Sequence, residues 1–137
     1  MKFYFDSSAL TKRYISEPGS GNIDRLFLEA ESIVVSSICL LEIISALSRL
    51  LREKKLNVPQ YNQCKRAVLE DFASFEVCQL SSEVLNTTIA VLEDSRLRAA
   101  DAIHVASAVE AKVSRFVSSD AKQIEAAKKF KLTVDSA

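Results

Sequence analysis

The sequence predicts an α/β/α sandwich whose central sheet is mainly parallel and has about four to five strands. The first observation is that short β-branched or aromatic runs alternate with longer segments whose apolar residues have helical spacing. The second is that the chain has a high aliphatic content and only 2 glycines and 2 prolines, which gives no support to a disordered or repetitive chain. The chain of 137 residues has the length of one domain, and we expect 1–137 to form a single domain.

The N-terminal part is expected to alternate between strands and helices. Lys2–Phe5 is a short aromatic strand that runs into turn-forming residues, and Ala9–Ile15 follows as a helix. Glu17–Gly21 contains both glycines and is expected to be a loop. Asn22–Glu31 has apolar residues at helical spacing, whereas Ser32–Ser37 is a β-branched strand.

Two long amphipathic helices are expected next, at Ile38–Lys55 and Val58–Phe75, and we expect them to pack as a hairpin. Phe75–Leu80 can form a short third strand. Ser81–Ser95 begins with serines that can cap a helix, and Ala99–Lys112 is a further helix.

The C-terminal part contains a strand at Arg115–Ser118, a helix at Asp120–Phe130 and a last strand at Leu132–Val134. Strands that are joined by helical crossovers run parallel, with a right-handed connection. Their carboxyl ends then lie at one edge of the sheet, where open α/β folds build their sites.

Composition limits which binding partners and which cellular compartment are expected for this protein. Lys plus Arg balances Asp plus Glu at 18 each, so the strong basic excess of many DNA-binding proteins is absent. The three cysteines, Cys39, Cys64 and Cys78, lie among apolar residues and are expected to be reduced core thiols. The apolar start of the chain is too short for a signal peptide, and no run approaches the ~18 apolar residues of a membrane span. We therefore expect a cytoplasmic protein that does not contact a membrane.

Four acids lie at sequence positions that this fold would bring to the edge of the sheet where the strands end. Asp6 closes the first strand and Asp120 follows the fourth, while Glu42 and Asp101 lie near the starts of their helices. Each acid has a simpler explanation. Asp6 and Asp120 can cap the helices that follow them, Glu42 can begin a polar stripe on an exposed helix face, and Asp101 can interact with a positive helix end.

Acids gathered at one edge favour a bound cation. At ~4 Å two carboxylates repel by about 4 kcal/mol at an effective dielectric constant of 20, so they must protonate or bind a cation. All-oxygen ligands indicate Mg²⁺ or Mn²⁺, and such an ion suits the hydrolysis of a phosphodiester. No competing nucleophile site or phosphate-binding loop is present, and the single histidine, His104, is expected to be structural between Ile103 and Val105.

The chain resembles the PIN-domain nucleases, especially the VapC-type toxins of toxin–antitoxin pairs. The segments that carry the resemblance span nearly the whole chain: Phe5–Leu10 with Glu17–Ser20, then Ser36–Glu42, Leu97–His104 and Phe116–Asp120. The ordered set with this spacing is specific, although each segment alone is weak.

The resemblance implies a PIN-like fold and a Mg²⁺- or Mn²⁺-dependent endoribonuclease in which a metal-activated water attacks RNA, leaving 5′-phosphate and 3′-hydroxyl ends. It implies that Asp6, Asp101 and Asp120 are the metal-site acids and that Glu42 is a direct or water-mediated partner. It also implies a homodimer, and a small cognate antitoxin that occludes the site.

Two details refine this expectation. Some relatives have a further acid shortly after the fourth one, whereas this chain has Lys122 and Gln123, so the number of metal ions stays open. Ser7 and Ser119 are expected to act only as outer hydrogen-bond donors.

Arginines are expected to form a basic rim that contacts phosphates, because a guanidinium group can bind a phosphate through two hydrogen bonds. The candidates are Arg13, Arg96 and Arg98, each of which lies near an acid-bearing segment. A solvated surface charge is the simpler explanation for each of them.

Two other functions stay open. Asp6 at the end of the first strand suits a covalent nucleophile in a phosphatase that resembles the haloacid dehalogenases, but Ser8 replaces the second acid of that family. The other is a non-catalytic PIN-like module that binds RNA or a protein.

Overall fold

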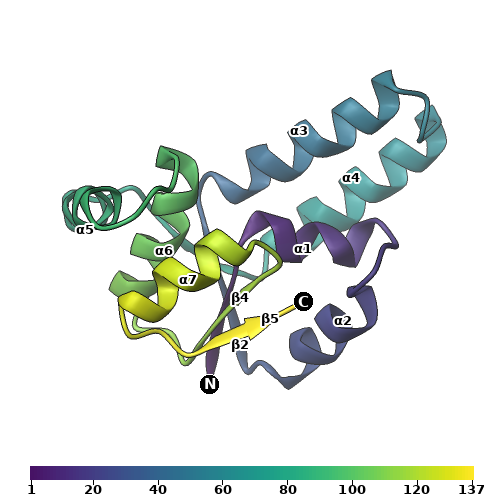
Figure 1. Ribbon diagram of the computed structural model, residues 1–137. Coiled ribbons are helices and arrows are strands. Elements are labelled where there is room, and N and C mark those ends of the chain that lie inside the picture. The colour runs from purple at the N-terminus through teal and green to yellow at the C-terminus, as the bar shows by residue number, and fades with distance from the viewer.

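The computed structural model describes residues 1–137 and contains a five-stranded sheet with the strand order β3-β2-β1-β4-β5 (Figure 1). The strands are β1 (Lys2–Phe5), β2 (Ser32–Ser36), β3 (Glu76–Cys78), β4 (Arg115–Ser118) and β5 (Val134–Ser136). Every pair of neighbouring strands is parallel. The predicted sheet is confirmed, and it is parallel throughout.

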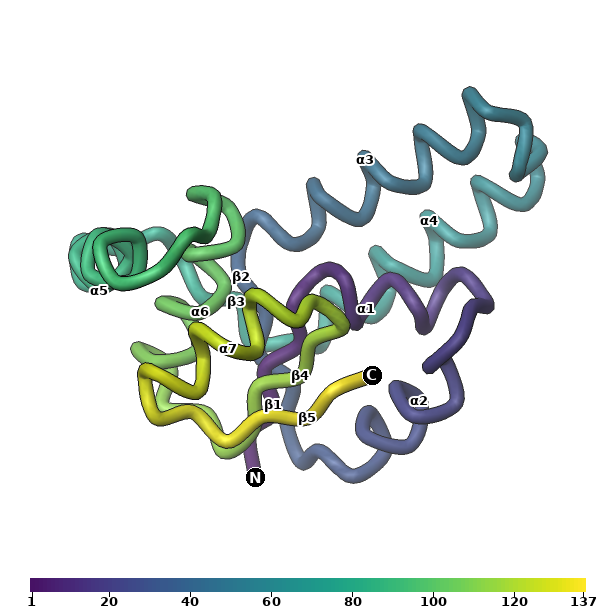
Figure 2. Tube along the Cα trace, viewed as in Figure 1, coloured from purple at the N-terminus to yellow at the C-terminus, as the bar shows by residue number.

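Helices cover both faces of this sheet, which confirms the predicted sandwich (Figure 2). They are α1 (Ser7–Tyr14), α2 (Ser20–Glu29), α3 (Cys39–Arg52), α4 (Val58–Phe72), α5 (Ser82–Glu93), α6 (Ala99–Ala111) and α7 (Ala121–Lys129). The first four pack on one face, and the last three pack on the other.

Strand β1 shows why two separate cores form. Phe3 and Phe5 belong to the core under α1 to α4, whereas Tyr4 between them belongs to the core under α5 to α7. Successive side chains of a strand point to opposite faces, and a parallel sheet is buried on both. The aromatic run at the start of the chain therefore joins the two layers.

Helices α3 and α4 form the predicted hairpin, which projects from the body of the molecule (Figure 1). Asn57 caps α4 in a reciprocal arrangement, because its side chain accepts from the amide of Gln60 at 2.8 Å and the Gln60 side chain accepts from the amide of Asn57 at 2.9 Å. The three cysteines are free, as expected. No helix is both long and apolar enough to cross a membrane.

Most boundaries shift by one to three residues from the sequence prediction, and two of these shifts have a clear structural cause. The last strand is Val134–Ser136 rather than Leu132–Val134, because its backbone pairs in register with the end of β4 and Asp135 forms an ion pair with Arg115 at 2.9 Å. Helix α2 begins at Ser20, inside the predicted loop. Gly19, at φ 96°, adopts the left-handed backbone that starts this helix.

Candidate active site

The carboxyl ends of β1 and β4 bring Asp6 and Asp120 to the same edge of the sheet. The two strands are neighbours with Phe5 opposite Val117, and the amide of Asp6 donates to the carbonyl oxygen of Val117 at 3.1 Å. Asp120 follows the end of β4 and begins α7. Residues from opposite ends of the chain thus reach one edge, as the parallel topology predicts.

Asp6 is fully buried and caps α1. Its Oδ1 accepts hydrogen bonds from the amide of Ala9 at 2.9 Å and the hydroxyl of Ser8 at 2.8 Å, and its Oδ2 accepts one from the hydroxyl of Ser118 at 2.6 Å. Burial raises the pKa of Asp6, although these hydrogen bonds act in the opposite direction. The ionised carboxylate is therefore destabilised by its surroundings.

Asp120 caps α7 in the same way. Its Oδ1 accepts hydrogen bonds from the amides of Lys122 at 2.8 Å and Gln123 at 3.3 Å. The capping explanation is thus confirmed for both Asp6 and Asp120. It does not remove their negative charges from the edge of the sheet, so capping and a role in the site are compatible.

Asp101 lies in the first turn of α6 and is half-buried. Its Oδ1 accepts a hydrogen bond of 3.1 Å from the side-chain amide of Gln123 on α7. Burial raises the pKa of Asp101, and the negative charges of Asp120 and Glu42 raise it further. Acids from the starts of three helices therefore interact electrostatically at this edge.

Glu42 lies in the first turn of α3, and its carboxylate is held by two donors. Its Oε1 accepts hydrogen bonds of 2.6 Å from the hydroxyl of Ser7 and 2.6 Å from Nε2 of His104. Burial acts to raise the pKa of Glu42, but the hydrogen bonds from His104 and Ser7 outweigh it, and the pKa is lowered. Glu42 is therefore an ionised group in a defined orientation rather than part of a purely solvated stripe.

A buried tyrosine completes this network. The hydroxyl of Tyr4 lies 2.7 Å from Nδ1 of His104, and burial raises the pKa of Tyr4 well above its usual value, so the hydroxyl stays protonated and donates. The proton of His104 then lies on Nε2, where it donates to Glu42, an assignment that follows from the hydrogen-bond partners.

Sequence reasoning missed three side chains that organise the acids. His104 is buried, as expected of a structural residue, but it also binds Glu42. Gln123 binds Asp101, and Ser118 binds Asp6. The only available signal was the spacing of three positions between Asp101 and His104, which places both on one helix face.

The serine predictions are confirmed only in part. Ser7 donates to Glu42 as expected, whereas the hydroxyl of Ser119 is buried without a hydrogen-bond partner. The amide of Ser119 donates to Ser8, and it is Ser8 that donates to Asp6.

The donors fit a hard divalent cation in their chemistry. All four acids supply oxygen, and two of the buried polar atoms without a partner, Ser119 Oγ and Gln123 Oε1, lie beside the acids. The side chains as they stand do not converge, because no group of three or more Asp, Glu, His or Cys residues is placed to hold a metal ion. Their carboxylates are instead engaged by the hydrogen bonds described above.

Fewer arginines are available for the basic rim than the sequence predicts. Arg13 is engaged elsewhere, since it pairs with Asp71 at 3.0 Å and its guanidinium carbon lies 3.7 Å from the centre of the Phe27 ring. Arg96 and Arg98 form no ion pair with any acid. These two remain as candidates for contacts with phosphate.

The fold defines the chain as an α/β/α protein with four acids at the edge of a parallel sheet where its strands end. The family model of the PIN domain matches residues 3–129. The chain belongs to the PIN domain family.

Solved structures share this fold at low sequence identity. VapBC2 from Rickettsia felis, bound to a DNA fragment from its promoter, is 14% identical with a TM-score of 0.71, and the match covers 100% of this chain and 99% of that chain. VapC20 from Mycobacterium tuberculosis, a toxin that cleaves the sarcin–ricin loop, is 14% identical with a TM-score of 0.68 and coverages of 90% and 94%.

A toxin–antitoxin complex from Klebsiella pneumoniae is similar to the same degree. It is 14% identical with a TM-score of 0.67, and the match covers 88% of each chain. No sequence among the curated proteins matches this chain.

Proposed function

We propose that this protein is a Mg²⁺- or Mn²⁺-dependent endoribonuclease and the toxin of a toxin–antitoxin pair. The observation that carries the proposal is the position of Asp101, whose pKa is raised by burial and by the charges of Asp120 and Glu42. Like charges from three helices are held near one another at the sheet edge, where a bound cation would relieve their repulsion. Membership of the PIN domain family and the toxins among the similar structures support the same function.

In this proposal Asp6, Asp101 and Asp120 hold the ion, with Glu42 as a direct or water-mediated partner. When bound, the ion lowers the pKa of a water molecule and stabilises negative charge on the phosphate. Gln123 holds Asp101 in place, and Ser118 holds Asp6. Glu42, oriented by His104 and Ser7, can accept a proton from a water molecule at the site.

The phosphatase alternative fits the geometry less well. A phosphatase of this kind needs a second acid two positions after its nucleophile, whereas here Ser8 occupies that position and donates to Asp6. Both oxygens of Asp6 accept hydrogen bonds from Ser8, and each accepts another from Ala9 or Ser118. The RNA-cleavage experiment below distinguishes the nuclease from a non-catalytic binding module.

The purified protein, freed of any antitoxin, is expected to cleave single-stranded RNA in Mg²⁺ or Mn²⁺ and to lose this activity in EDTA. Gel analysis of end-labelled fragments should show 5′-phosphate and 3′-hydroxyl ends. Undiminished cleavage in EDTA would exclude the metal-dependent mechanism. RNA binding without cleavage in either ion would favour the binding module.

We propose two protein partners, a second copy of the chain and an antitoxin that covers the site. The similar structures include a toxin–antitoxin complex, which supports the antitoxin. Glu42 lines a hollow of about 570 Å³ between α3 and α6 together with Arg49, Arg52 and apolar side chains, among them Leu41, which is 69% exposed. An occupant of this hollow would lie directly against the proposed catalytic acid.

Leu41→Asp is expected to weaken binding of the antitoxin by about tenfold or more, because it places a charge in an apolar contact. Titration of the purified partner against RNA cleavage measures the change, and light scattering on a size-exclusion column measures the dimer. Equal inhibition of Leu41→Asp and the wild type would show that the antitoxin does not bind at this hollow. A monomer at micromolar concentration would contradict the dimer.

A further inference from the structure

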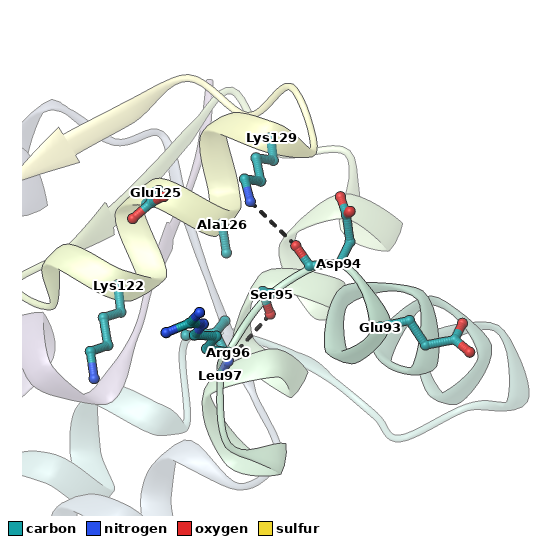
Figure 3. Close-up of a pocket in the computed structure, with 9 residues that line it drawn as sticks. All are labelled: Glu93, Asp94, Ser95, Arg96, Leu97, Lys122, Glu125, Ala126 and Lys129. Atoms are coloured by element: carbon teal, nitrogen blue, oxygen red, sulfur yellow. Dashed lines mark hydrogen bonds between the residues drawn. The ribbon is translucent and has the colours of Figure 1, made fainter.

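A second hollow lies between the loop that joins α5 to α6 and helix α7 (Figure 3). Its volume is about 510 Å³, within the size range of small-ligand sites. Arg96 and Leu97 line it from the loop, and Lys122, Ala126 and Lys129 line it from α7.

The cations of this hollow are not neutralised within the protein. Arg96 and Lys122 form no ion pair, and Lys129 donates only to the backbone carbonyl of Asp94 at 3.4 Å. Figure 3 shows the guanidinium group of Arg96 among the other lining residues, whereas the side chain of Glu93 points away from them. Three acids, Glu93, Asp94 and Glu125, also line the hollow, so its formal charges balance, but none of them forms an ion pair with a cation.

The hollow is continuous in the chain with the acids of the site. Lys122 follows Asp120 by two positions, and its amide is bound by the Asp120 side chain. Arg96 lies three residues before Ala99, the first residue of α6, and this helix carries Asp101. Gln123, on α7, links that helix directly to Asp101. The hollow and the acids are thus built from the same two segments of the chain, the start of α7 and the segment that leads into α6.

We propose that this hollow binds the phosphate and ribose of a nucleotide next to the scissile bond in single-stranded RNA. The inference rests on the proposed nuclease function and names the binding site for its substrate. The four carboxylates repel a polyanion, so unpaired cations near them are needed to hold RNA there. Arg96 can contact a phosphate through two hydrogen bonds, and Lys122 adds a point charge.

Apolar surface between these cations suits the rest of the nucleotide. Leu97 and Ala126 are buried beneath the charged side chains and give the hollow a small apolar floor. Single-stranded nucleic acid is commonly bound by cations along the backbone together with apolar or aromatic contacts to the sugar and base. The hollow has no aromatic side chain, so we expect little preference among bases at this position.

The test measures the binding of a fluorescein-labelled oligoribonucleotide in EDTA at several salt concentrations. Arg96→Gln and Lys122→Gln are each expected to weaken binding by about threefold to tenfold and to lower the salt dependence by roughly 0.7 in log–log slope, the value for one lost phosphate contact. Lys128→Gln is the matched control, because Lys128 lies on the same helix, is exposed and does not line the hollow. It is expected to bind RNA as the wild type does.

Several outcomes would overturn the proposal: no binding of RNA by the wild type, unchanged binding by Arg96→Gln and Lys122→Gln, or an equal loss in Lys128→Gln. Tighter binding of the corresponding oligodeoxyribonucleotide through the same two side chains would overturn the assignment to RNA. A cleavage assay in Mg²⁺ keeps the two proposals apart. Weaker binding by the variants without cleavage by the wild type contradicts only the nuclease, whereas cleavage with unchanged binding contradicts only the hollow.

Discussion

Asp101→Asn is expected to lower the rate of RNA cleavage by at least about 100-fold, the usual effect of removing one preorganised charged group from an active site. The replacement keeps the shape of the side chain and an oxygen that can accept the hydrogen bond from Gln123. It removes the charge that interacts with Asp120 and Glu42. Initial rates on a labelled RNA in Mg²⁺ measure the loss, and Asp6→Asn is expected to give a loss of the same order.

The matched control is Glu110→Gln. Glu110 lies on the same helix as Asp101 but near its other end, where its side chain accepts a hydrogen bond of 3.1 Å from Thr87. Glutamine keeps an acceptor there, so the cleavage rate should not change. Full activity in both Asp101→Asn and Asp6→Asn would remove the acids from the mechanism.

Stability should change in the opposite direction to activity in Asp6→Asn. Because the folded pKa of Asp6 is raised, the native state keeps its proton at a pH where the unfolded chain has lost it. The free energy of unfolding therefore decreases as the pH rises from the unfolded pKa of about 4 through the folded pKa. The decrease is about 1.4 kcal/mol for each unit by which the two pKa values differ. Asn does not ionise and caps a helix as well as Asp does.

Thermal unfolding in EDTA between about pH 4 and pH 8 measures this effect. We expect Asp6→Asn to be more stable than the wild type near neutral pH and to show a flatter pH profile. A loss of both activity and stability at pH 7 would instead show that the hydrogen bonds of the carboxylate matter more than its burial.

His104→Asn is expected to lower cleavage by about 10-fold to 100-fold, the usual cost of removing a group that orients a catalytic or metal-binding side chain. His104 is a positioning residue, because it contacts Glu42 rather than a substrate. An asparagine side chain can replace Nδ1 but does not reach the position of Nε2. A glutamine side chain does reach it, so His104→Gln should recover much of the activity.

The comparison of these two variants separates orientation from packing. Both put an amide in a site that is 1% exposed, so thermal unfolding should show similar losses of stability. Tyr4→Phe removes the donor to Nδ1 and is expected to reduce cleavage less than His104→Asn, because the bond from Nε2 to Glu42 remains possible. Equal cleavage rates in the asparagine and glutamine variants would contradict the positioning role.

The order of the elements could be read from the sequence because its determinants are local. The aromatic run Lys2–Phe5 and the helical spacing in α3 and α4 depend on neighbouring residues, and the parallel crossovers follow from the alternation. The end of the chain was predicted less well. Val134–Ser136 is a strand because β4 offers its backbone as a partner, which no property of these three residues indicates.

The sequence by itself determined that Asp6, Glu42, Asp101 and Asp120 reach one edge of a parallel sheet, since strand ends and helix starts set those positions. Only the tertiary structure decided which side chains hold them. The contacts of Glu42 with His104 and of Asp6 with Ser118 join residues 62 and 112 positions apart. Hydrogen bonds need a specific distance and direction, which depend on how whole layers pack rather than on any local pattern.

Tertiary packing also decides which arginines are available to bind a phosphate. Arg13, Arg96 and Arg98 look equally suited to a phosphate in the sequence, because each is a cation near an acid-bearing segment. In the fold, Arg13 pairs with Asp71, which lies 58 positions away, while Arg96 and Arg98 stay unpaired near the acids. Local sequence sets where a charge lies along the chain, and tertiary packing decides whether it is neutralised or left for a ligand.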